Sequence, residues 1–178
     1  GSLFSIRADG TEFLEAPVKF SLWHAPTYNG GSAAYWKLVR FNRVFQSVYS
    51  TVLTPFDGEK TVIKADIALG PMSSPPTIRG FARYEFYPDG SLLFFFDGDV
   101  REVFRLLPKI GLELSLKSGN ENIEFYGRGP YEAYVDRHLS ARIARWKPTA
   151  TENFEHYPRP QENSSHYQTL WATVSDDA

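Results

Sequence analysis

Two carboxylates and two guanidinium groups stand close together in residues 126–138, which read YGRGPYEAYVDRH. Glu132 and Asp136 are four residues apart, a spacing that places two side chains on the same side of a helical turn. Glycoside hydrolysis requires such a pair, with one carboxyl as proton donor and the other as nucleophile or base. Arg128 and Arg137 favour a different interpretation, because a neighbouring guanidinium lowers a carboxyl pKa whereas a catalytic acid needs a raised one. We therefore predict that Arg128, Glu132, Asp136 and Arg137 form structural ion pairs.

A second polar cluster occupies residues 157–167, which read YPRPQENSSHY. Its side chains can donate and accept several hydrogen bonds between two tyrosines, and sites that bind sugar hydroxyl groups have this composition. The same residues also suit an ordinary turn in which a carboxylate caps backbone amides. Both interpretations remain open for the polar candidates of this cluster, which are Arg159, Glu162, Asn163 and His166.

A third cluster precedes Gly30 and Gly31, in a long segment that we expect to form a loop. Loops on a β scaffold often carry the binding residues. The four histidines of the chain are scattered without metal-ligand spacing, and there is no cysteine, so we predict no metal site. The candidates in this third cluster are Trp23, His24, Thr27 and Asn29.

Composition limits the classes of partner. The 178 residues include 19 basic and 21 acidic side chains, which are interspersed and give a net charge of -2. A nucleic-acid-binding protein needs a basic face, and the sequence predicts none. No apolar run approaches the roughly 20 residues needed to span a bilayer. The length fits a single domain over residues 1–178, and nothing in the sequence identifies a compartment.

The elements that must position these clusters are strands. Aromatic residues make up 16% of the chain, which suits pleated, half-buried surfaces. Apolar and polar residues alternate in residues 61–69 and again in residues 112–116, and the latter pattern continues in residues 123–125 across a turn at residues 118–120. About ten such segments, separated by turns, are typical of an antiparallel sandwich or barrel. The sequence therefore predicts an all-β, antiparallel fold.

Turns and special segments refine this expectation. Asp-Gly pairs at positions 9–10, 57–58 and 89–90 predict three β-hairpins. The five consecutive large apolar residues 92–96 predict a strand covered on both faces. Residues 33–39 and parts of residues 130–138 are the stretches where we expect a turn or two of helix.

Three stretches together resemble one family. LWHAPTYN at residues 22–29, YGRGPYEAYVDR at residues 126–137 and YPRPQENSSH at residues 157–166 are similar, in order and spacing, to the motifs of the C-terminal or small-chain domain of family 2 β-galactosidases. The similarity extends from about Leu3 to Val174, and the last two motifs are specific. His24, Tyr28 and Gly30 depart from the pattern, in which Arg and two Asp residues are usual.

The resemblance implies a truncated galactose-mutarotase-like supersandwich, a large antiparallel β fold. In the full enzymes of the family, the two catalytic glutamates belong to a separate TIM barrel, so the resemblance implies that this chain has no catalytic residue and that Glu132 and Glu162 are not that pair. It places the third cluster at the rim of the active site. The implied partners are the remaining domains, including the TIM barrel, other subunits of an oligomer, and a galactoside bound through the full enzyme. It implies Mg²⁺ and Na⁺ in other domains and no cofactor here.

Three functions follow as hypotheses. The first is a noncatalytic domain that shapes the entrance of a β-galactosidase active site. The second is a mutarotase-like aldose epimerase, in which His138 or His166 acts as acid and Glu132 or Glu162 as base. The third is a carbohydrate-binding module that uses exposed Trp and Tyr rings.

Overall fold

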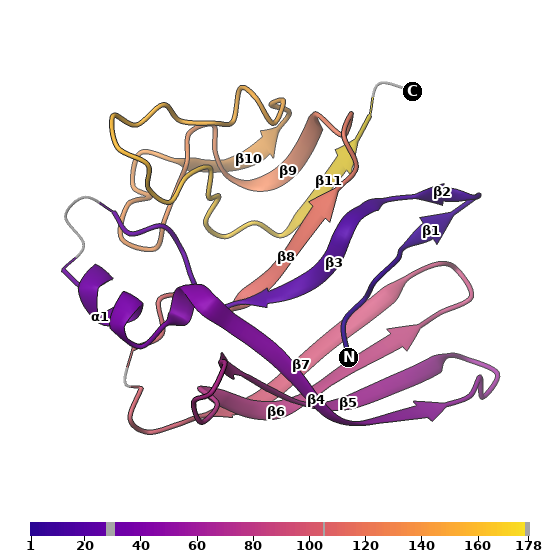
Figure 1. Cartoon of the computed structure of the whole chain (residues 1–178). Helices are drawn as coiled ribbons and strands as arrows, with labels where there is room; N and C mark the ends of the chain where they lie inside the picture. Colours follow the sequence, from indigo (N-terminus) through magenta and orange to yellow (C-terminus); the bar gives the residue numbers. More distant parts are fainter. Residues whose placement is uncertain (28–30, 105, 177–178) are drawn as a thin grey trace. The chain divides into compact units, whose positions relative to one another are not determined.

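A computed structural model describes residues 1–27, 31–104 and 106–176 (Figure 1). Within these residues the chain is nearly all β, with antiparallel sheets, as the sequence predicts. The short helix α1 (Ala33–Leu38) and the single 3-10 turn η1 (Phe41–Arg43) account for the helical structure in this described part. The first of these confirms the expected helix in residues 33–39. No helix among the described residues has the length and apolarity to cross a bilayer.

The chain divides into two compact units. Unit 1 comprises Gly1–Ser5, Pro17–Trp23 and Ser32–Leu114, and unit 2 comprises Ile6–Ala16, His24–Gly31 and Ser115–Ala178. Two paired strands, β3 (Leu14–Ser21) and β8 (Gly111–Leu116), each pass from one unit into the other. That residues 1–178 behave as one domain stays a prediction.

Unit 1 is built on a four-stranded antiparallel sheet. Its strands are β4 (Val44–Thr54), β5 (Thr61–Pro71), β6 (Ile78–Phe86) and β7 (Leu92–Val100), and their order in the sheet follows their order in the chain. The predicted hairpins at positions 57–58 and 89–90 are both confirmed. Gly58 and Gly90 adopt φ angles of 101° and 85°, which glycine tolerates without strain. The Asp57 carboxylate accepts hydrogen bonds from the backbone N–H groups of Glu59 and Lys60, and these bonds lower its pKa.

The core of unit 1 lies on one face of this sheet. Alternate residues of β5 and β6 are buried there, together with Leu22. Phe20 of β3 packs against Phe94 and Phe96 of β7, with ring centroids 5.9 and 4.9 Å apart. The prediction that residues 92–96 are covered on both faces is wrong, because Leu93 and Phe95 point to the other face and are 47% and 40% exposed. β7 is an edge strand with one covered face.

Unit 2 contains a three-stranded sheet in the order β10 (Arg142–Trp146), β9 (Asn122–Gly129) and β11 (Trp171–Ser175). The sequence patterns at residues 112–116 and 123–125 are not hairpin partners, because β8 pairs with β3 while β9 pairs with β10 and β11. The small hairpin of β1 (Arg7–Ala8) and β2 (Thr11–Glu12) confirms the turn at positions 9–10.

Candidate functional site

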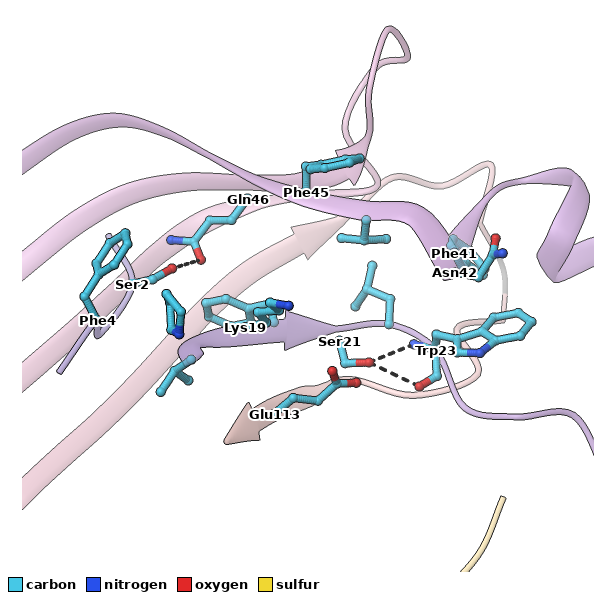
Figure 2. A pocket seen from close by; sticks show the side chains of 15 residues that line it. Ser2, Phe4, Lys19, Ser21, Trp23, Phe41, Asn42, Phe45, Gln46 and Glu113 are labelled. Atoms are coloured by element: carbon cyan, nitrogen blue, oxygen red, sulfur yellow. Dashed lines mark hydrogen bonds between the residues drawn. The ribbon is translucent and has the colours of Figure 1, made fainter. Parts of the chain in front are cut away.

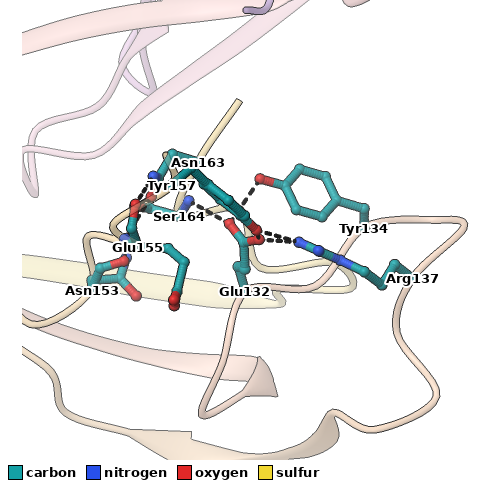
Figure 3. Close-up of polar contacts among 8 residues, drawn as sticks. All are labelled: Glu132, Tyr134, Arg137, Asn153, Glu155, Tyr157, Asn163 and Ser164. Carbon is teal, nitrogen blue, oxygen red and sulfur yellow. Dashed lines mark hydrogen bonds and ion pairs between the residues drawn. The ribbon is translucent and has the colours of Figure 1, made fainter. Parts of the chain in front are cut away.

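Glu132 is the centre of the polar network in unit 2 (Figure 3). Its Oε1 atom accepts hydrogen bonds from the Tyr157 hydroxyl and the Arg137 guanidinium. Its Oε2 atom accepts from the Tyr134 hydroxyl at 3.1 Å and from the backbone N–H of Ser164 at 3.1 Å. The Glu132 side chain is only 7% exposed. A carboxylate has about four lone-pair sites, so these four donors occupy the whole acceptor capacity of the group.

The network keeps the Tyr134 hydroxyl protonated and the Arg137 guanidinium charged. Burial, and then the charge of Glu132, raise the pKa of Tyr134 well above its usual range, so its hydroxyl remains a donor. The hydrogen bond from Arg137 to the Tyr157 hydroxyl and the charge of Glu132 raise the pKa of Arg137. Tyr134, Tyr157 and Ser164 were not among the candidate residues predicted from the sequence. For Tyr134, the only local indication of a contact with Glu132 was its position two residues later in the sequence.

The segment that carries Glu132 forms a tight turn, so the expected helix in residues 130–138 is wrong. Reciprocal backbone hydrogen bonds of 3.0 Å join Tyr134 and Arg137. Asp136 lies in this turn and is exposed, and within the described residues the structure records no ion pair or hydrogen bond for its carboxylate. A helix would have placed the side chains of Glu132 and Asp136 side by side. The turn separates them.

Arg128 also differs from the prediction. Its guanidinium donates to the Gln168 side-chain oxygen at 2.7 Å and to the Ala141 carbonyl oxygen at 2.7 Å. The predicted ion-pair network is therefore reduced to the pair between Glu132 and Arg137. Arg128 instead fixes the backbone that follows the turn.

The glycines of this motif allow close packing around β9. A Cβ atom on Gly129 would lie 2.7 Å from the indole ring of Trp146, and one on Gly127 would lie 2.9 Å from the Cα atom of Thr169. Only glycine permits such an approach without displacement of its neighbours. The Trp146 indole N–H donates to the Gly127 carbonyl oxygen at 3.2 Å.

Backbone contacts join the second cluster to this turn. The N–H of Ala133 donates to the Ser165 carbonyl at 2.7 Å, and the N–H of Tyr167 donates to the Ala133 carbonyl at 3.0 Å. Asn163 accepts from the N–H of Glu155 and donates to the Glu155 carbonyl. These bonds match the turn interpretation of Asn163, which stabilises the loop that presents Ser164 to Glu132.

His166 is enclosed in the same loop. Its Nδ1 atom lies 2.9 Å from the Arg128 carbonyl oxygen and its Nε2 atom lies 2.7 Å from the Asn153 side-chain oxygen. Its ring stacks on Phe125, with centroids 4.0 Å apart. Burial lowers the pKa of His166, so the ring is neutral at pH 7 and donates from Nδ1. A neutral ring then accepts at Nε2, which places the amide nitrogen of Asn153 toward it, since the two ends of an amide are interchangeable by rotation.

Glu162 connects the second cluster to the third. Its backbone N–H donates to the Ala25 carbonyl at 3.0 Å, and its carboxylate accepts from the Ala25 N–H at 3.2 Å. Arg159 is exposed and lines a hollow of about 340 Å³ with Tyr157, Pro158 and Gln161. The Glu162 carboxylate thus caps the backbone N–H of Ala25, in agreement with the turn interpretation of this cluster.

One small pocket gathers residues from all three clusters within unit 2. Its volume is about 160 Å³. Drug-sized ligands bind in pockets of about 300 to 1,000 Å³, so this space suits the edge of a ligand or a single polar group. Both acidic and basic groups face it. The residues that line it are Thr27, Tyr134, Asp136, Arg137, Gln161 and Glu162.

The remaining described candidates of the third cluster, Trp23 and His24, are consecutive residues assigned to different units. Trp23 belongs to unit 1, where its ring meets Trp36 edge to face at 6.4 Å. His24 belongs to unit 2, is half-buried, and places Nδ1 3.0 Å from the Ala25 carbonyl oxygen. Asn29 lies outside the described residues. Among the residues that the structure does describe, no group of three or more His, Asp or Glu side chains is arranged to hold a metal ion.

The fold and this site define the chain as an antiparallel β protein in which residues from three polar motifs line one small pocket of a compact unit. The family profile of the β-galactosidase small chain matches residues 1–178, and the chain belongs to that family.

Curated relatives agree with this assignment. A β-galactosidase of Staphylococcus xylosus is 27% identical over 157 residues, which are 88% of this chain and 16% of that protein. A β-galactosidase of Actinobacillus pleuropneumoniae is 26% identical over 168 residues, which are 94% of this chain and 17% of that protein. A β-galactosidase of Psychromonas ingrahamii is 43% identical over 70 residues, which are 39% of this chain and 7% of that protein. The chain thus spans about a sixth of the length of the first two relatives.

Proposed function

We propose that this chain is a noncatalytic part of a family 2 β-galactosidase, with a galactose-mutarotase-like fold, and that it shapes the active-site entrance. The complete enzyme would hydrolyse terminal β-D-galactosides, and its catalytic carboxylates would lie outside this chain. The supporting observation is the combination of a family match over all 178 residues with a length about a sixth of that of β-galactosidase relatives.

The environment of Glu132 supports a structural role. Four donors saturate its oxygens, and a residue that protonates a leaving group or attacks a sugar needs a free oxygen that faces the substrate. Asp136, the nearest carboxylate in sequence, is exposed and has no hydrogen-bonded partner among the described residues. The two carboxylates therefore lack the shared, enclosed setting of an acid and a nucleophile.

The contacts of the histidines disfavour an epimerase. His166 uses both ring nitrogens on Arg128 and Asn153, and His138 places Nδ1 3.1 Å from the Tyr134 carbonyl oxygen. A general acid must reach the ring oxygen of a bound sugar with a free N–H. His166 is half-buried and has no such group in this conformation.

The aromatic rings on the outer face of the unit 1 sheet disfavour a carbohydrate-binding module there. Sugar rings stack on open aromatic faces, but cations already cover three of these rings. The pairs, with the distance from the cation to the ring centroid, are Lys64 on Phe81 at 3.9 Å, Arg83 on Phe95 at 4.2 Å and Arg79 on Tyr49 at 4.6 Å.

The first test is hydrolysis of nitrophenyl β-galactoside by the 178-residue chain and by the full-length enzyme. We expect turnover only in the full-length enzyme. Turnover by the isolated chain that disappears in Glu132→Gln or Glu162→Gln would overturn the proposal. Turnover that both variants retain would point to contamination, which repurification would remove.

The second test concerns the entrance. Thr27 and Asp136 line the small pocket without any part in the Glu132 network. In the full-length enzyme, Thr27→Val and Asp136→Asn should raise KM several-fold, about 2 to 5 times, and leave kcat nearly unchanged, because such contacts bind substrate and transition state equally. The matched control is Thr149→Val, a threonine elsewhere in unit 2 that does not line this pocket. Unchanged KM in both pocket variants would remove these residues from the entrance.

A further inference from the structure

β4 is an edge strand with little of the usual protection of an edge. The sheet order places it at one end, and among the described residues no strand pairs with its outer side. Its eleven residues, VFQSVYSTVLT, include no charge and no proline. Five of its large side chains are between 43% and 60% exposed, and these are Phe45, Val48, Tyr49, Val52 and Leu53.

The opposite edge of the same sheet shows the contrast. β7 ends in Asp97, Gly98, Asp99 and Val100, so two carboxylates lie along it. Charged side chains, prolines and bulges are the devices that prevent edge strands from pairing with other chains. β4 has one such device, the register shift between Val48 and Ser50. Its last five residues, from Ser50 to Thr54, follow that shift in regular register with β5 and are unprotected.

A groove of about 530 Å³ begins beside the first residues of β4 (Figure 2). Val44, Phe45 and Gln46 form one wall, and Lys19 and Ser21 of β3 contribute to the other. The buried Nε2 atom of Gln46 has no hydrogen-bond acceptor within the described part of the chain. The Oε1 atom of the same amide accepts from the Ser2 hydroxyl. The groove therefore has both apolar and polar walls and contains one buried donor that lacks an acceptor among the described residues.

We propose that the free edge of β4 is a docking site for an extended, uncharged segment from the remaining β-galactosidase polypeptide, which adds a fifth strand to the sheet. This inference rests on the proposed function. The occupant follows from two observations: the edge offers apolar side chains and backbone groups but no charge, and relatives are about six times longer than this chain. A segment of the same polypeptide also binds intramolecularly, which favours it over a second copy.

Hydrogen exchange tests whether β4 is covered. The isolated chain and the full-length enzyme are compared for the peptide that contains residues 44–54, with residues 61–71 of β5 as the internal reference. We expect residues 44–54 to exchange at least about tenfold more slowly in the full-length enzyme, because pairing protects the outward N–H groups. Residues 61–71 should change little, since β5 is paired on both sides already.

Adjacent proline substitutions test whether the cover is a paired strand. Successive residues of an antiparallel strand direct their N–H groups to opposite sides. Of the two substitutions Thr51→Pro and Val52→Pro, one therefore removes a hydrogen bond to β5, and we call it the inward variant. The other removes an N–H donor on the free side of β4, and we call it the outward variant. The inward variant should destabilise the isolated chain. The outward variant should leave the isolated chain folded, and in the full-length enzyme it should return residues 44–54 to the exchange rate of the isolated chain.

Three outcomes would overturn the proposal. The first is equal exchange of residues 44–54 in both proteins. The second is protection that neither proline variant removes, which would mean that side chains alone cover the strand. The third is a concentration-dependent dimer of the isolated chain with protected residues 44–54, which would make a second copy the occupant. Galactoside turnover of the full-length enzyme is measured separately, so failure of the proposed function does not alter the exchange result.

Discussion

Replacement of Glu132 by alanine tests the polar network most sharply. Three of its donors, the hydroxyls of Tyr134 and Tyr157 and the N–H of Ser164, are partly buried, and each bond to a charged acceptor is worth about 1.5 kcal/mol. The Arg137 side chain is 55% exposed, so screening limits its ion pair to less than about 1 kcal/mol. Neighbouring contributions are not additive. We expect Glu132→Ala to lower the free energy of unfolding by about 3 to 4 kcal/mol.

The assay is thermal unfolding followed by circular dichroism. For a chain of this size about 1 kcal/mol corresponds to roughly 2 to 4 °C, so the midpoint should fall by roughly 10 °C. Asp136→Ala is the matched control, because it removes a carboxylate four residues away that has no partner among the described residues. That control should change the stability by less than about 0.5 kcal/mol.

Activity separates a structural from a functional role for Glu132. In the full-length enzyme, Glu132→Ala should reduce the folded yield more than the galactoside turnover per folded molecule. A variant that is as stable as the parent, but whose turnover per folded molecule falls by about a hundredfold, would contradict a structural role for Glu132. Equal destabilisation by Asp136→Ala would also refute it, because the two carboxylates would then share the role.

Two further predictions concern the packing around β9. Burial lowers the pKa of His166, so the unfolded chain binds its proton more readily, and the stability that this ring contributes is present above pH 6.5 and declines as pH falls toward the lower folded value. Denaturant titrations should therefore show a smaller loss between pH 7.5 and 5.5 in His166→Gln than in the parent, and an equal loss would contradict the assignment. Gly129→Ala should cost about 1 to 3 kcal/mol because its Cβ atom would lie 2.7 Å from Trp146, whereas the control Gly111→Ala, with its nearest neighbour atom at 3.9 Å, should be nearly neutral. If Gly129→Ala left the free energy of unfolding in chemical denaturation unchanged, the indole ring would have to move aside freely.

Local features of the fold were predictable from the sequence. The turn at Asp9-Gly10 requires two positive φ angles, and the structure gives 50° and 81°. The alternation in residues 61–69 buries Ala65, Ile67 and Leu69 on one face. Turns and strand alternation depend only on residues that are neighbours in the chain, so a single sequence is enough to predict them.

Pairing and exposure depended on contacts that are distant in sequence. The run of apolar residues in β7 suggested a covered strand, but its place at the sheet edge leaves Leu93 and Phe95 exposed. β10 was not predicted, because its sequence, RIARW, has two arginines among three apolar residues. Its strand character follows from pairing with β9, which no local pattern reports.

The candidate site was predictable in its motifs and not in its geometry. Spacing on a helix suggested that Glu132 and Asp136 act together, but the backbone makes a turn between Tyr134 and Arg137. The partners of Glu132 include Tyr157 and Ser164, 25 and 32 residues away in sequence. Tyrosine hydroxyls that complete a carboxylate network look like ordinary aromatic residues until the fold brings them together.

We propose that this chain supplies no catalytic group to the complete enzyme. The most direct measurement is kcat of the full-length enzyme with Asp136→Asn and Glu162→Gln combined, normalised to active sites by titration with a tight inhibitor. Both carboxyl groups line the small pocket, and the substitutions remove their charge and proton-transfer capacity while they keep the shape. We predict a kcat within about threefold of the parent, because no proton transfer is lost. A loss of about a hundredfold or more, with the enzyme folded, would place catalysis in this chain and contradict the claim.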